Sequence, residues 1–184
     1  MAAVHTISGA LVTQHRKILV ELFGADVVGR ALATLTPDQR LALDGATSLS
    51  YVPIPTAEAM FAAMARELGR ETASVHEQVS RTSVEQNLKT IWRLFLRFTS
   101  DEALVARTPV IFGKAFPQGT LIPRVLSPGR ADIRVEGWPA MPDYAIRGTR
   151  VAIETVLRLA GREGVKIVAD RTSDGVVYIT TWIP

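Results

Sequence analysis

Residues 165–182, VKIVADRTSDGVVYITTW, decide the fold of this chain. Valine and isoleucine are frequent at both ends of the stretch, threonine and aromatic residues are frequent at the second end, and Ser173-Asp174-Gly175 lies between the two runs. Two such runs joined by a short turn that contains Asp-Gly are typical of a β-hairpin. The stretch therefore predicts two antiparallel strands, over residues 165–171 and 175–182.

Upstream of this hairpin, the apolar pattern changes character near Pro109. Before Pro109 the apolar residues recur at helical spacing, and after it they follow strand-like patterns. Turn residues divide the second pattern into three predicted strands, over residues 109–116, 119–126 and 131–137. One helical pattern, over residues 142–161, separates these strands from the hairpin.

This order of patterns predicts an α+β fold, because a helical layer is followed by a mainly antiparallel sheet. We expect the helical N-terminal half to pack on the C-terminal sheet, which has one inserted helix. A chain of 184 residues fits one domain. We therefore expect a single domain over residues 1–184, with a helical subdomain at 1–108 and a sheet subdomain at 109–184.

Capping residues mark the ends of several helices in the first half. Gly24 and Gly69 each follow an apolar helical stripe and are expected to end those helices. Thr36, which precedes Pro37, and Thr56 are each expected to be an N-cap. The longest predicted helix spans residues 74–98. It is expected to kink or break near residues 81–83, where its apolar stripe loses phase.

The composition excludes several classes of protein. Hydrophobic residues make up 47% and charged residues 21%, so a long disordered stretch is not expected. The absence of cysteine excludes disulfides, thiolate nucleophiles and zinc–thiolate sites. No apolar run approaches the ~18 residues that a membrane span needs, and the N-terminus does not resemble a signal peptide. We expect a soluble cytoplasmic protein without membrane insertion.

The net charge of +3 belongs to the second half, which holds 10 basic and 7 acidic residues from Pro109 onward. Nucleic acid is the obvious partner to consider for a basic chain. However, only 7% of the residues are aromatic, no run of lysine and arginine occurs, and no nucleic-acid motif fits. Nucleic-acid binding is therefore not the favoured interpretation.

The three histidines offer little support for a metal centre. His15 lies on the apolar stripe of the first helix and is interpreted as a core or boundary residue. His76 is expected on or near the surface, and His5 lies near the N-terminus. No two histidines stand three or four residues apart, as metal ligands on one helix face would. We expect no metal and no cofactor.

Catalytic motifs are missing as well. The sequence contains no G-x-S-x-G motif, no phosphate-binding glycine loop and no pair of carboxylates with an assignable role. We therefore expect a protein that is not an enzyme.

An arginine series is the one suggestive cluster of charge. Its members Arg124, Arg130, Arg134, Arg147 and Arg150 could bind an anionic ligand or an acidic partner if several of them converge. The alternative interpretation is a solvated face held by helical pairs four residues apart. Three such pairs are predicted: Asp143–Arg147, Arg150–Glu154 and Glu154–Arg158.

A small-ligand pocket is a second hypothesis. The apolar loop at residues 51–55, YVPIP, and a methionine-rich helix face could line a space between helices and sheet, with an arginine as anchor. The alternative is that these side chains simply form the core. The candidate ligand-binding residues are Tyr51, Met60, Met64, Trp92, Arg124 and Arg130.

A series of short landmarks resembles a known family over nearly the whole chain. These landmarks are Ser8-Gly9-Ala10, Phe23-Gly24, YVPIP at residues 51–55, Glu67-Leu68-Gly69, Arg147-Gly148, Gly164-Val165 and the final YITTW at residues 178–182. Their order resembles an uncharacterised paralogous family found mainly in myxobacteria. That family is in turn distantly similar to haem nitric-oxide-binding (H-NOX) and vinyl-reductase-like small-molecule-binding domains.

The H-NOX resemblance implies a set of haem-binding residues that can be compared with this chain. The family holds haem with a histidine on a helix before the sheet and grips its propionates with a Tyr-x-Ser-x-Arg motif at a strand turn. Here the turn contains Ser127 and Arg130, three residues apart, and lacks the tyrosine. No histidine follows His76. The resemblance therefore implies the fold, and a haem ligated by histidine is not expected.

Three hypotheses of function follow. The first is a non-catalytic sensor or adaptor domain in signalling, which binds a small apolar or anionic ligand, a protein partner or a second copy of itself. The second is a gas sensor that depends on haem or another cofactor. The third is an enzyme of unknown class.

Overall fold

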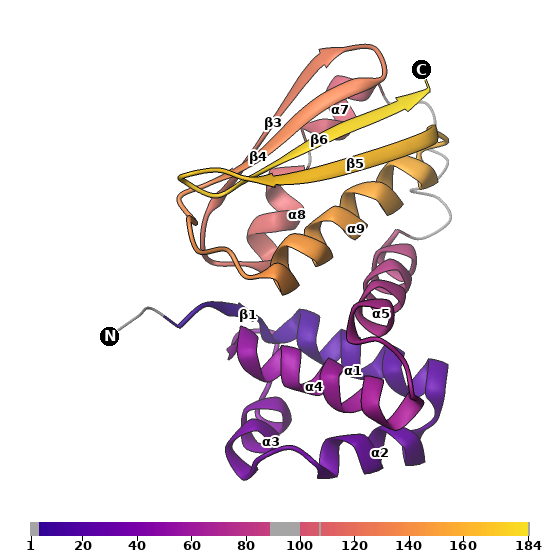
Figure 1. The fold of residues 1–184 in the computed structure, drawn as a ribbon, viewed down its shortest axis with the longest axis vertical. Coiled ribbons are helices and arrows are strands. Elements are labelled where there is room, and N and C mark those ends of the chain that lie inside the picture. The colour runs from indigo at the N-terminus through magenta and orange to yellow at the C-terminus, as the bar shows by residue number, and fades with distance from the viewer. Residues whose placement is uncertain (1–3, 89–99, 107, 184) are drawn as a thin grey trace. The chain divides into compact units, whose positions relative to one another are not determined.

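The structure is a computed structural model that describes residues 4–88, 100–106 and 108–183. The chain divides into two compact units, Met1–Ser83 and Val84–Pro184. Figure 1 shows helices filling most of the first unit, and a sheet with helices forming the second. The predicted α+β fold class is confirmed. A single domain divided after residue 108 stays a prediction.

The first unit consists mainly of helices, with one short ladder of two strands. Along the chain its elements are β1 (Thr6–Ser8), α1 (Gly9–Phe23), α2 (Ala25–Ala33), α3 (Pro37–Asp44), β2 (Tyr51–Pro53), α4 (Ile54–Leu68) and the greater part of α5 (Thr72–Asn87).

The ladder between β1 and β2 is a feature that the sequence analysis missed. The two strands pair antiparallel, with Ile7 opposite Val52, and each of these side chains is 1% exposed. Pairing two buried β-branched residues explains why part of the predicted loop becomes a strand. Helix α4 then begins at Ile54 and not after the predicted N-cap Thr56, because Pro55 fits the first helical turn without an N–H to satisfy.

The other predicted helix ends in this unit are confirmed. Thr36 Oγ1 accepts a hydrogen bond from the Gln39 N–H at 3.3 Å, and the Thr36 N–H donates to Gln39 Oε1 at 3.1 Å. This reciprocal pair is a capping box at the start of α3. Gly24 ends α1 at a φ of 86° and Gly69 ends α4 at a φ of 62°, which are conformations that favour glycine.

Helix α5 accounts for the first part of the predicted long helix. It runs without interruption from Thr72 to Asn87, so the break predicted near residues 81–83 is absent. The rest of the predicted helix, including Trp92, lies outside the described residues.

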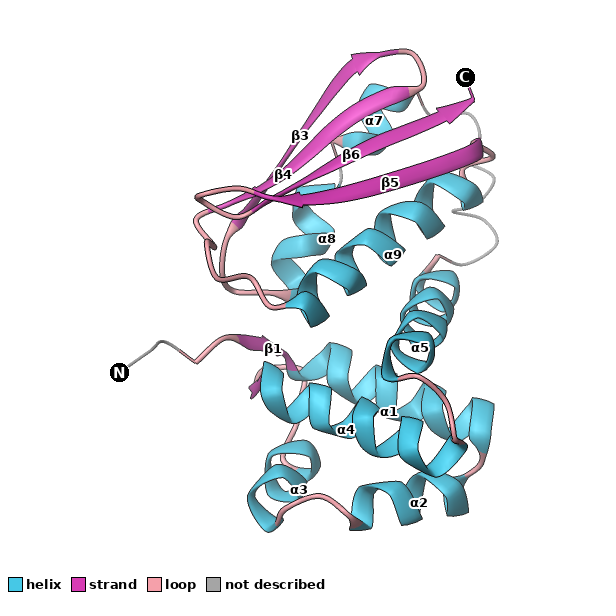
Figure 2. Ribbon diagram, viewed as in Figure 1, coloured by secondary structure: helices cyan, strands magenta, loops and turns pink. Residues whose placement is uncertain are grey.

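The second unit is a four-stranded antiparallel sheet with the strand order β3-β4-β6-β5. Figure 2 shows that the helices α7, α8 and α9 all lie against one face of this sheet. The elements in chain order are α7 (Asp101–Val105), α8 (Thr108–Ala115), β3 (Thr120–Ser127), β4 (Arg130–Glu136), α9 (Asp143–Leu159), β5 (Glu163–Arg171) and β6 (Val176–Ile183). The inserted helix and the final hairpin are therefore where the sequence predicts them.

The strand predicted to begin at Pro109 is wrong, because this segment is helix α8. Phe112 and Phe116 stand four residues apart and are 5% and 6% exposed, whereas Val110 and Ile111 are 62% and 48% exposed. One apolar side of the helix thus covers the sheet and the other faces solvent. A short apolar run rich in β-branched residues cannot be assigned to helix or strand by periodicity alone. Two substantial helices, not one, therefore follow residue 108.

The two faces of the sheet differ as an alternating pattern requires. Ile133 and Val135 of β4 are each 1% exposed and face the helices, whereas Arg134 between them is exposed.

The two edge strands of the sheet differ in whether they contain proline. Pro123, which has no N–H, lies within edge strand β3, and the opposite edge strand β5 contains no proline.

Among the described residues, no helix combines the length and the apolar character that a membrane crossing requires.

Candidate functional site

Two histidines from different helices meet in the core of the first unit. His15 of α1 and His76 of α5 are 3% and 2% exposed, and their ring centroids lie 6.4 Å apart. Phe61 of α4 contacts both rings edge-on, at centroid distances of 5.6 Å from His15 and 4.8 Å from His76. These three side chains form what we call the histidine cluster, which ties together three helices.

Burial determines the charge of His15. It lowers the pKa of His15 to about 4, because an apolar environment disfavours the charged imidazolium. Nδ1 of His15 has no hydrogen-bond partner within the described residues. The ring is therefore neutral at pH 7, and a neutral imidazole can accept a hydrogen bond or bind a metal ion.

The structure confirms one histidine prediction and contradicts the other. His15 is a core residue, as its place on the first apolar stripe predicts. The sequence predicts His76 on or near the surface, but it is buried in a row with Ser80 and Ser83 on α5. These residues recur at helical spacing, so their spacing alone indicates one buried helix face. Because histidine and serine are polar, the residue types suggest a solvent-exposed face instead.

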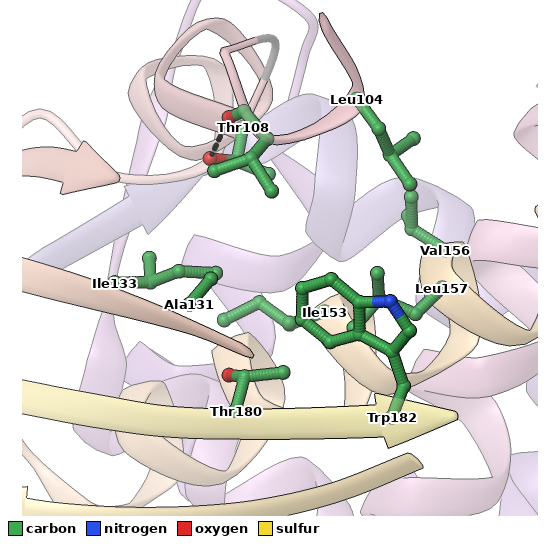
Figure 3. Close-up of a pocket in the computed structure, with 10 residues that line it drawn as sticks. Leu104, Thr108, Ala131, Ile133, Ile153, Val156, Leu157, Thr180 and Trp182 are labelled. Carbon is green, nitrogen blue, oxygen red and sulfur yellow. Dashed lines mark hydrogen bonds between the residues drawn. The ribbon is translucent and has the colours of Figure 1, made fainter. Parts of the chain in front are cut away.

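A small apolar cavity lies in the second unit, between the inner face of the sheet and the three helices (Figure 3). Its volume is about 10 Å³, which is close to the least space that holds one water molecule. Ligand sites usually have volumes of about 300–1,000 Å³. The cavity is lined by Leu104, Val105, Thr108, Ala131, Ile133, Ile153, Val156, Leu157, Thr180 and Trp182.

The cavity has few polar groups to offer a guest. Thr108 Oγ1 is already engaged, since it donates to the Val105 carbonyl at 2.8 Å. Trp182 Nε1 is buried and has no hydrogen-bond acceptor within the part of the chain that the structure describes. The surface that lines the cavity is apolar, so even a water molecule would lack hydrogen-bond partners there, and the cavity is too small for a larger ligand. Neither Thr108 nor Trp182 stands out in the sequence, because their place beside the cavity depends on the packing of segments that are distant along the chain.

Tyr178 of β6 joins the inner face of the sheet to α9. Its hydroxyl donates to the Ile146 carbonyl at 3.3 Å. Burial raises the pKa of Tyr178, so the phenol stays protonated at neutral pH. This contact is structural and supplies no acid or base near neutrality.

The candidate ligand-binding residues that precede the sheet in the sequence have different environments. Met60 and Met64 are both 0% exposed and stand one turn apart on α4. Tyr51 lies on β2 and is 58% exposed. Trp92 lies outside the described residues. The methionines thus share one helix face, and a pocket that would join them to Tyr51 and Trp92 stays a prediction.

Arg124 and Arg130, the candidate anchors, lie in the second unit. They stand on the neighbouring strands β3 and β4, and both side chains are exposed. Their backbones pair within the sheet, but neither side chain has an ion pair or hydrogen bond among the described residues. An anchoring role for either arginine stays a prediction.

The helical ion pairs predicted for α9 are partly right. Glu154 binds Arg158 at 2.6 Å and lies 3.9 Å from Arg150. Asp143, however, binds Arg171 of β5 at 2.6 Å and not Arg147. A contact across 28 residues replaces the local one because β5 passes beside the start of α9.

Residues 4–88, 100–106 and 108–183 contain no group of three histidine, aspartate or glutamate side chains that could hold a metal ion. The histidine cluster therefore contributes at most two such ligands.

Comparison with known proteins identifies the architecture. No family model and no curated protein sequence matches the chain. Solved structures do match, among them a mutant of the H-NOX protein from K. algicida in the Fe(II) unliganded state. Its TM-score is 0.70 at 10% identity, with 96% of this chain and 97% of that chain covered. The chain has the H-NOX fold.

Two further structures with the H-NOX fold support this assignment. One is an oxygen-binding H-NOX domain related to soluble guanylate cyclases, with a TM-score of 0.65 at 14% identity over 96% of this chain and 95% of that one. The other is a mutant of T. tengcongensis H-NOX, with a TM-score of 0.63 at 17% identity over 96% and 98%. The H-NOX resemblance is thus confirmed for the fold, and the myxobacterial family stays a prediction.

Proposed function

We propose that this chain is a sensor domain with the H-NOX fold, which responds to a small ligand and acts in signalling and not in catalysis. The observation that carries the proposal is the match of almost the whole chain to solved H-NOX structures. One of these is an oxygen-binding domain related to soluble guanylate cyclases, and another is a structure in which protein-induced distortion of the porphyrin modulates the redox potential of haem. These neighbours support the gas-sensor hypothesis better than the hypothesis of a haem-free adaptor.

Whether haem fits depends on the residues near the sheet. The resemblance implies an axial histidine on a helix before the sheet, but α7 reads DEALV and α8 reads TPVIFGKA. The whole sequence has no histidine after His76. At the β3–β4 turn, Ser127 and Arg130 are exposed and no tyrosine precedes them. The residues of the sheet half do not fit a haem held in the way the family holds it.

This disagreement favours a second candidate, which is sensing of a small ligand without haem. The two candidates differ in the ligand and agree in the role of the domain. In both candidates the chain works as a receptor, and ligand binding changes the surface that the domain presents to a partner protein.

Haem titration separates the candidates. Purified protein would be titrated with hemin, and its absorbance recorded in the Fe(III), Fe(II) and carbonyl states. A saturable Soret band at one haem per chain would support the haem-based sensor. Loss of that band in His15→Ala or His76→Ala, with His5→Ala unchanged, would identify an axial ligand in the first half of the chain.

A protein without a saturable Soret band would support the haem-free sensor. Native mass spectrometry would then identify any co-purifying ligand, and a panel of metabolites and fatty acids would be screened for a rise in melting temperature. If neither haem nor any of these ligands binds, the sensor proposal is wrong and the domain acts through its surface alone.

A further inference from the structure

Strand β5 is an open edge of the four-stranded sheet. It pairs only with β6 within the described residues. The N–H of Thr172 donates to the Gly175 carbonyl at 2.9 Å, and this bond fixes the alternation along the ladder. Bonded pairs recur at every second residue of an antiparallel ladder. The backbone groups of residues 166, 168 and 170 therefore point to β6, and those of residues 167, 169 and 171 point away from the sheet.

The outer face of this edge strand carries a short pattern of charge. Lys166, Val168 and Asp170 alternate along β5, and all three side chains are exposed, Val168 by 57%. Lys166 and Asp170 have no ion-pair partner in the described part of the chain. A lysine, a valine and an aspartate at equal spacing form a pattern that complements itself when read antiparallel.

We propose that β5 pairs antiparallel with β5 of a second copy of this chain, about a two-fold axis at Val168. In this register Lys166 lies opposite Asp170 of the partner subunit, and the symmetry repeats the pair. Val168 faces its own counterpart on the axis. The two sheets then continue as one sheet of eight strands.

The backbone alternation agrees with this register. Ile167 and Ala169, whose N–H and carbonyl groups point outward, become hydrogen-bonded partners across the axis. Lys166 and Asp170 fall in the non-hydrogen-bonded pairs, where opposing side chains are closest. An axis at Ile167 would instead place Lys166 opposite Val168 and leave both charges unmatched. Charge therefore selects the register.

A charge swap tests the proposal on the full chain. Sedimentation velocity over a range of concentrations would give the dimer dissociation constant of wild type, Lys166→Asp, Asp170→Lys and the double variant Lys166→Asp/Asp170→Lys. Each single variant places like charges opposite each other twice, so its dissociation constant should rise about tenfold or more. The double variant restores opposite charges across the axis, so its dissociation constant should return to within about threefold of the wild-type value.

Two further variants guard against a misleading result. Arg134→Asp changes the charge of the same sheet face away from the edge, on β4, and should leave the dimer unchanged. Ala169→Pro removes an outward N–H without removing a bond to β6, so it should abolish the dimer while circular dichroism and melting temperature show a folded chain. A wild type that is monomeric up to about 1 mM would overturn the proposal. So would a dimer that tolerates both single charge variants.

Discussion

The imidazole of His15 lies 6.4 Å from the imidazole of His76, although α1 and α5 are separated along the chain by three other helices. Phe61 contacts both rings, so the cluster excludes water from each of them. The unprotonated state of His15 is therefore part of the folded structure, and protonation opposes folding.

We expect acid to destabilise the fold through His15. Its pKa is lowered from 6.5 to about 4, so the unfolded chain binds the proton first as the pH falls. This contribution to stability is fully present above pH 6.5 and is lost between pH 6.5 and about 4. The loss is about 3 kcal/mol. Urea unfolding at a series of pH values would measure it.

Replacement of the titrating ring provides the control for this prediction. His15→Phe should flatten the dependence of stability on pH across the same window, and His5→Phe should leave it as in wild type. A His15→Phe variant with an unchanged slope would show that other groups cause the acid sensitivity.

The aromatic group under the sheet should contribute strongly to stability. Phe112 lies 5.3 Å from Phe116 and 6.5 Å from Trp138, measured between ring centroids, and is 5% exposed. Phe112→Ala should lower the free energy of unfolding by about 3–5 kcal/mol, because it leaves a cavity. Ile111→Ala on the same helix should cost less than about 1 kcal/mol, since that side chain is half exposed. Equal losses in denaturant melts would contradict the orientation of α8.

The ion pair between Arg162 and Asp101 should matter more than an exposed one. Two guanidinium nitrogens of Arg162 donate to Asp101 Oδ1, at 3.0 Å and 2.8 Å, and the two side chains are only 15% and 18% exposed. Asp101→Asn should cost about 1–3 kcal/mol, because a charged donor that is mostly buried loses its anionic acceptor. High salt should reduce this loss of stability only slightly, because salt screens such a pair less than an exposed one.

Arg30 and Glu67 form the matched comparison, at 2.8 Å with side chains 62% and 27% exposed. Glu67→Gln should cost at most about 0.5 kcal/mol. A thermal melt of both variants in the same buffer would rank them, and the opposite ranking would contradict the argument from burial.

Local patterns were sufficient to predict much of the fold. The hairpin of β5 and β6 follows from two β-branched runs around Asp174-Gly175, and the ends of α1, α3 and α4 follow from Gly24, Thr36 and Gly69. Each of these features depends on residues that are close in sequence. Their physical causes, which are turn geometry and capping, operate within a few residues.

Features that depend on distant partners could not be predicted in the same way. The segment after Pro109 has apolar residues suited to strand or helix, and only the packing of Phe112 against Trp138 decides for α8. His76 reads as a polar surface residue until α1 and α4 bring His15 and Phe61 against it. The candidate ligand site is harder still to predict, because Tyr51 and Met60 lie in the first unit of the chain and Arg124 lies in the second.

Pro123 has a consequence for how copies of this chain can aggregate. Growth of a β-fibre needs strands that can accept a neighbour on both sides, and a proline within an edge strand removes a backbone donor there. One edge of this sheet is thus blunted while the other can accept a neighbour. Pairing through β5 would use the edge of this four-stranded sheet that contains no proline, so the assembly of these sheets would close at two copies. The chain would then have built-in protection against amyloid-like polymerisation.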